Sequence, residues 1–118
     1  MKKLILAALI LAAPAYAHDM PGNHGGVVAD VGTMHVELVA NVKALELYLT
    51  DHSNKAVAAD KFKATAVLVV EGKVHRIALT PAGGNRLTGN ASIPLPARPK
   101  GAIQIQTETG ASLQGKLP

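Results

Sequence analysis

Alternation of apolar and polar side chains is the clearest pattern in the middle of this chain. Residues 33–40 alternate with a period of two, and residues 43–50 repeat the pattern. Because successive side chains of a strand point to opposite faces, each run predicts a strand with one buried face. With a turn at residues 41–42, the two strands form a hairpin. The buried pairs predicted for it are Met34 with Leu49, Val36 with Leu47 and Leu38 with Leu45.

The same register pairs the outward-facing side chains of the hairpin. His35 is expected opposite Tyr48, and Glu37 opposite Glu46. Two carboxylates in directly opposite positions repel each other, and a bound cation would reverse the sign of that interaction.

The rest of the chain also favours strands. Residues 64–71 are apolar on both faces and predict a central strand, and Gly72 allows a tight reversal into the next one. Further runs predict an edge strand at 27–30, strands at 73–79, 86–95 and 101–107, and a loop at 80–85. Six to seven short strands with Gly and Pro turns and no convincing helix predict an all-β fold, a small antiparallel β-sandwich or barrel.

The N-terminus has the pattern of a secretory signal. A basic start, an apolar run at 4–13 and Ala15-Tyr16-Ala17 predict cleavage after Ala17 and export to the periplasm, with no stable membrane insertion afterwards. A lipid anchor would require a cysteine at the cut, and the chain has none. We therefore divide the chain into a signal peptide at 1–17, a flexible arm at 18–26, a β-domain at 27–108 and a C-terminal tail at 109–118.

Removal of the signal changes the charge of the working protein. It takes away two lysines and leaves 101 residues with a net charge of +2. No basic cluster and no aromatic stacking platform remain, which argues against nucleic acid as a partner. With no cysteine, no Gly-x-Ser-x-Gly motif and three aromatic residues, the chain is not expected to be an enzyme.

Histidine is the residue type that points to a function. Four of the five histidines lie near the start of the exported chain: His18, His24, His35 and His52. His35 and Glu37 share one strand face, His24 precedes the first strand, and His52 follows the second strand of the hairpin. Imidazole and carboxylate are ligands of transition metals, so His24, His35, Glu37 and His52 are candidate metal ligands. A solvated strand face accounts for His35 and Glu37 without any ligand.

The new N-terminus offers a second kind of site. After cleavage His18 would present its amine and imidazole together, as in a copper histidine brace, and Met20 would add a soft thioether for Cu⁺. Imidazole suits copper, zinc and nickel alike, so the expected ion is copper or zinc, with nickel as an alternative. Two other interpretations of His18 are open. It could belong to a copper redox enzyme, or signal cleavage could have left a histidine by chance at a mobile end.

Several short motifs resemble a known group of proteins. The runs that carry the resemblance are residues 24–28 (HGGVV), 34–39 (MHVELV), 45–51 (LELYLTD) and 79–89 (LTPAGGNRLTG). They are similar to small periplasmic proteins and domains with an HGG signature, associated with heavy-metal efflux and found in N-terminal segments of metal-efflux membrane-fusion adaptor proteins. The resemblance implies a β-rich metal carrier or buffer with His24, His35 and Glu37 at the matching positions. Its partner would be an efflux system or a metal acceptor protein.

Two further interpretations remain open. The chain also resembles the CopC-like periplasmic copper carriers, whose mature chain begins with histidine, and this would place the metal at His18. The second interpretation is a metal-free interaction module, which would dock on an envelope partner through a sheet edge.

Overall fold

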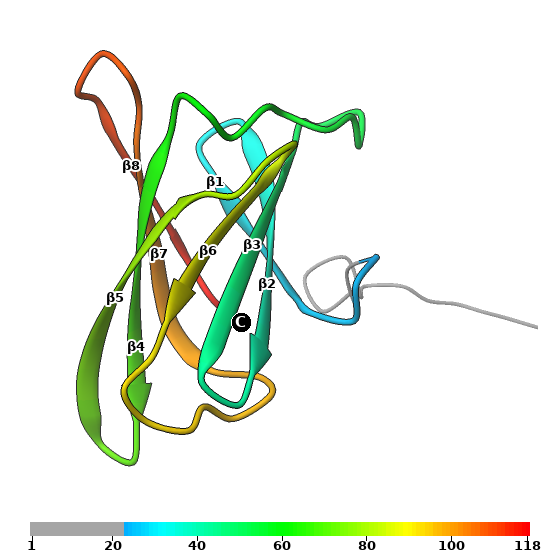
Figure 1. Ribbon diagram of the computed structural model, residues 1–118. Helices are drawn as coiled ribbons and strands as arrows, with labels where there is room; N and C mark the ends of the chain where they lie inside the picture. Colours follow the sequence, from blue (N-terminus) through cyan, green and yellow to red (C-terminus); the bar gives the residue numbers. More distant parts are fainter. Residues whose placement is uncertain (1–22) are drawn as a thin grey trace, which may run out of the picture.

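The computed structural model describes residues 23–118, and these form eight antiparallel strands and no helix (Figure 1). The strands are β1 (Val27–Val31), β2 (Met34–Asn41), β3 (Ala44–Thr50), β4 (Lys63–Val70), β5 (Lys73–Pro81), β6 (Arg86–Asn90), β7 (Lys100–Gln106) and β8 (Ser112–Lys116). The predicted signal and the candidate ligands His18 and Met20 lie outside the described residues. In residues 23–118 there is no helix with the length and hydrophobicity needed to span a membrane.

The eight strands form one curled sheet in the order β1-β2-β3-β6-β5-β4-β7-β8. The curl brings β8 back beside β1, so the sheet is nearly a closed barrel (Figure 1). Gly115 of β8 lies so close to β1 that a Cβ there would collide with the carbonyl oxygen of Asp30. The predicted all-β barrel or sandwich is thus confirmed, with eight strands where the sequence predicts six or seven.

The interior of the barrel is aliphatic. Inward-facing side chains alternate along each strand, as the sequence pattern predicts. The largest fully buried ones are Leu38, Leu45, Leu47, Leu49, Leu68, Leu79, Leu87, Ile103, Ile105 and Leu117. Since these side chains fill the interior, the polar chemistry is left to the outer face of the sheet.

The register of the β2–β3 hairpin differs from the predicted one by two residues. Leu38 lies opposite Leu47, not Leu45, and Val36 lies opposite Leu49. The turn is at residues 42–43, with Val42 at φ 50°, rather than at residues 41–42. In this position the two turn carbonyls accept hydrogen bonds from the backbone N–H groups of residues 91 and 95. A shift of two keeps every side chain on its predicted face.

The outward-facing pairs are therefore also different from those predicted. Glu37 lies opposite Tyr48 and His35 opposite Thr50. Glu46 lies opposite Val39 in the hairpin and forms an ion pair with Arg86. The predicted repulsion between Glu37 and Glu46 is wrong.

The predicted ends of several strands also need correction. β5 runs on through Pro81, and β6 stops at Asn90 although Ala91 and Leu95 are buried as predicted. The prolines at 94 and 96 have no N–H to donate, which prevents a continuous ladder there. β4 is a central strand, as predicted, since it lies between β5 and β7, but its outer face is partly exposed, and Val69 keeps 45% of its accessible surface.

The C-terminal segment is not the frayed tail that the sequence predicts for residues 109–118. β8 lies within it and pairs with β7, and Leu117 is only 2% exposed. β8 is short, and only Leu113 and Gly115 face inward in it, so a single apolar side chain marks the alternation within the strand. The β-domain therefore extends beyond residue 108.

Candidate metal site

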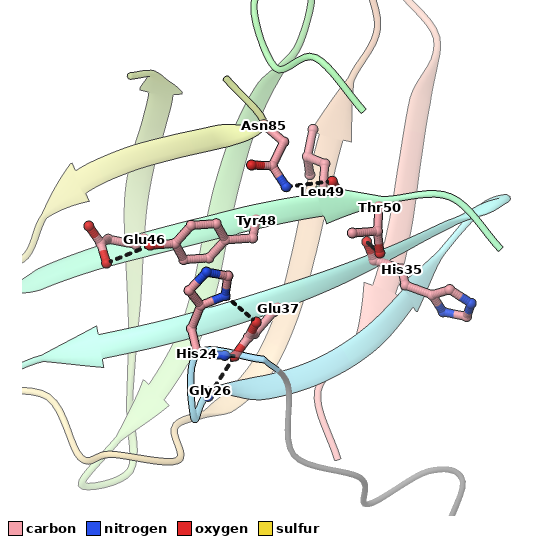
Figure 2. Close-up of polar contacts among 9 residues, drawn as sticks. All are labelled: His24, Gly26, His35, Glu37, Glu46, Tyr48, Leu49, Thr50 and Asn85. Atoms are coloured by element: carbon pink, nitrogen blue, oxygen red, sulfur yellow. Dashed lines mark hydrogen bonds and ion pairs between the residues drawn. The ribbon is translucent and has the colours of Figure 1, made fainter. Parts of the chain in front are cut away.

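The polar side chains of interest lie on the outer face of β1, β2 and β3 (Figure 2). β2 contributes His35 and Glu37, and β3 contributes Tyr48 and Thr50 directly opposite them. β1 contributes Asp30, which pairs with His35 across the other side of β2. Because all of these positions point away from the aliphatic core, three neighbouring strands present them on one surface.

Glu37 is held by the segment that enters β1. Its Oε2 accepts the backbone N–H of His24 at 2.7 Å and that of Gly26 at 2.8 Å, and its Oε1 lies 2.8 Å from His24 Nδ1 (Figure 2). Glu37 is 7% exposed, the lowest value for a charged residue in the described part of the chain. Its carboxylate thus fixes both the backbone and the ring of the preceding segment.

Two further contacts hold this segment on the sheet. The His24 ring stacks on Tyr48 with 3.7 Å between centroids and 5° between planes. A side chain at Gly26 would collide with the carbonyl oxygen of Leu38, so the close approach requires glycine. We call His24 and Gly26, with Glu37 and Tyr48, the arm anchor.

Hydrogen bonding decides the charge of Glu37. Burial alone would raise the pKa of its carboxyl, but the hydrogen bonds from the His24 side chain and from the Gly26 and His24 backbones outweigh burial and lower it below the ordinary value. Glu37 is accordingly a carboxylate at neutral pH, and it favours a proton on Nδ1 of His24. In the neutral form of the ring, this proton leaves the lone pair on Nε2 of His24.

Tyr48 is itself held from the other side. Its hydroxyl donates to Glu46 Oε1 at 3.2 Å, and Arg86 donates to Glu46 Oε2 at 2.7 Å. Burial and the neighbouring Glu46 carboxylate raise the pKa of Tyr48, so the phenol stays neutral. The ring on which His24 stacks is therefore fixed by a strand-to-strand ion pair.

A second group lies at the start of β2. His35 Nδ1 lies 2.6 Å from Asp30 Oδ1, and His35 Nε2 lies 3.1 Å from Nδ1 of His52. The two imidazole rings are almost perpendicular, with centroids 4.8 Å apart. Since a carboxylate faces Nδ1 of His35, the neutral form of this ring carries its proton on Nδ1 and its lone pair on Nε2.

His52 owes its position to the loop that follows β3. Asp51 Oδ1 accepts the backbone N–H groups of Ser53 and Lys55, and these contacts close a tight turn around His52. The backbone hydrogen bond from Lys55 is the main reason why the pKa of Asp51 is lowered. The turn places the His52 ring over the first residues of β2.

The structure brings the predicted ligands together in two pairs. His24 joins Glu37, and His35 joins His52. Among residues 23–118, no three His, Cys, Asp or Glu side chains converge on one point as a ready metal cluster. Sequence reasoning missed Asp30, which reaches His35 only through the β1–β2 register, and the edge strand predicted at 27–30 was the one signal that could have suggested it.

Both pairs line the same open groove. It has a volume of about 1210 Å³, and its walls include His24, Glu37, Tyr48, Asp30, His35 and His52. The two pairs therefore border one common space.

Comparison of the chain with protein-family models, curated proteins and solved structures gave no match. The resemblance to HGG-signature proteins thus stays a prediction from short motifs.

Proposed function

We propose that this protein is an exported transition-metal-binding protein, a periplasmic carrier or buffer, with His35 and His52 as its metal-binding pair. The proposed ion is copper or zinc, with nickel as an alternative. A role in metal resistance, efflux or delivery is proposed from the resemblance of the motifs. The observation that carries the proposal is the approach of His35 Nε2 to His52 Nδ1 at 3.1 Å.

This separation suits two nitrogen atoms bound to one ion. With metal–nitrogen bonds of about 2.0–2.1 Å, two imidazole nitrogens are about 2.9 Å apart at a right angle and about 3.3 Å apart in a tetrahedron. The observed distance lies between these values. Binding would place a metal ion between the two nitrogen atoms, and both rings would turn their lone pairs toward it.

Asp30 supports the same interpretation. A histidine that binds a metal through one nitrogen usually donates its other N–H to a carboxylate or carbonyl, which fixes the ring and makes the donor nitrogen more basic. Asp30 stands in this relation to His35. A purely structural surface histidine needs no such partner.

The accessibility of the pair favours a carrier over a permanent structural site. His52 is exposed, and the side chain of His35 keeps 30% of its accessible surface. A structural metal site is normally closed by four protein ligands. Two exposed ligands leave coordination positions open, and these positions allow exchange with solvent or an acceptor.

Metal titration of the purified protein tests the proposal. Cu²⁺, Zn²⁺ or Ni²⁺ should bind with a dissociation constant below about 10 μM, which corresponds to about 7 kcal/mol. The variant His35→Ala/His52→Ala should lose at least tenfold in affinity. His75→Ala, which removes a histidine on β5 outside the groove, is the matched control and should bind like the parent. Equal affinity of the double variant and the parent would disprove the assignment.

A further inference from the structure

The groove is much larger than a single hydrated ion requires. Its volume is about 1210 Å³, whereas each water of a hydration shell takes up about 30 Å³. Typical sites for small organic molecules occupy about 300–1,000 Å³. The groove therefore has room for an organic ligand beside the ion.

The metal-binding pair also leaves the coordination shell of the ion incomplete. Two imidazoles fill two of at least four coordination positions, and the part of the chain seen in the structure adds no third convergent ligand. The remaining positions lie on the side of the groove. A chelating molecule seated there would complete the coordination.

Two lysines bring positive charge to one side of the groove. β8 returns beside β1, and this return brings Lys116 to the groove, together with Lys100 at the start of β7. Neither lysine takes part in an ion pair within residues 23–118. The acidic groups of the same groove, Asp30 and Glu37, are held by hydrogen bonds to His35 and His24, so their carboxylates face the imidazole rings and not the lysines.

We infer that the groove binds its divalent metal as a complex with a small polycarboxylate chelator that leaves two adjacent coordination positions open. The nitrogens of His35 and His52 displace the two water molecules at these positions. Lys100 and Lys116 receive the carboxylates, because ammonium and carboxylate groups form strong charge-assisted hydrogen bonds. This inference rests on the proposed function and adds the chemical class of the co-ligand.

A pair of nickel complexes tests the inference. Ni²⁺–nitrilotriacetate is anionic and leaves two adjacent positions open. Ni²⁺–tris(2-aminoethyl)amine leaves the same two positions open but is cationic and lacks carboxylates. The purified protein should bind the first complex more tightly than the second, as measured by calorimetry at fixed ionic strength.

Lysine variants then identify the cause of the preference. Lys100→Gln/Lys116→Gln should weaken binding of the nitrilotriacetate complex by about fivefold, as expected for two partly exposed ion pairs. The same double variant should bind the tris(2-aminoethyl)amine complex at least as tightly as the parent does. The matched control, Lys61→Gln/Lys73→Gln, removes the same charge from exposed positions outside the groove and should leave both affinities unchanged.

The outcomes separate this inference from the proposed function. In one outcome, the protein binds both complexes through His35 and His52 while Lys100→Gln/Lys116→Gln binds the nitrilotriacetate complex as tightly as the parent does. In that case the polycarboxylate inference is wrong and the metal site stands. If His35→Ala/His52→Ala binds either complex as well as the parent does, the metal site itself is wrong.

Discussion

At the scale of single residues, the carboxylate of Glu37 has the most demanding environment. It is buried on the outer face of the sheet and accepts two backbone N–H groups and the His24 ring. The sequence indicated a polar outward position, but not that another segment would cover it. A buried carboxylate with three donors keeps its charge only while all of them stay in place.

Glu37→Gln keeps the size of the side chain and removes its charge. We expect the free energy of unfolding to fall by about 2 kcal/mol, because hydrogen bonds to a charged acceptor contribute about 1.5–3 kcal/mol. In addition, the NH₂ group of the new glutamine would face an N–H donor where the glutamate has an acceptor oxygen. Urea denaturation of the metal-free protein measures this change. Glu108→Gln, at an exposed position, should change stability by less than about 0.5 kcal/mol. Similar losses for both variants would contradict the role given to Glu37.

At the scale of elements, the β2–β3 register determines what the arm anchor can be. The turn at residues 42–43 puts Tyr48 opposite Glu37. Glu37 then contacts Nδ1 at the edge of the His24 ring, and Tyr48 stacks on the face of the same ring. In the register predicted from the sequence, Tyr48 would stand opposite His35, and Glu37 would have no ring beside it. The hydrophobic pattern alone cannot distinguish the two registers because both bury the same side chains.

Removal of the Tyr48 ring should loosen the arm anchor without unfolding the barrel. In Tyr48→Ala, hydrogen exchange at the Gly26 amide should accelerate about tenfold, since an aromatic stack contributes about 0.5–1.5 kcal/mol beyond its area. Tyr48→Phe keeps the stacked ring and should keep most of the protection. Exchange measured by NMR at residue resolution would show this difference, and equal protection in all three proteins would contradict it.

At the scale of the whole molecule, the approach of β8 to β1 closes the barrel and completes the groove. Gly115 permits this approach because it has no side chain to meet the Asp30 carbonyl. The same return of the chain brings Lys116 to the groove that holds the histidines. Barrel closure and the composition of the groove thus depend on one contact between the two ends of the sheet.

Gly115→Ala should push β8 away from β1. Because the new methyl group meets backbone and not a flexible side chain, we expect a loss of about 1–3 kcal/mol in the free energy of unfolding. Gln114→Ala, at the exposed neighbouring position, is the matched control and should be close to neutral. Thermal unfolding of the two variants checks this, and a Gly115→Ala protein as stable as the parent would show that the ends of the sheet do not need to touch.

The strands and their buried faces follow from the sequence alone, because a period of two is a local property. The histidines are candidate metal ligands from the sequence alone, because imidazole is a common metal ligand. Which side chains meet is a property of the tertiary fold. The fold separated the four predicted ligands into two pairs, added Asp30 to His35 and turned the expected tail into β8. These contacts depend on turn positions and on pairing between distant segments. The alternation within a single strand determines neither of these.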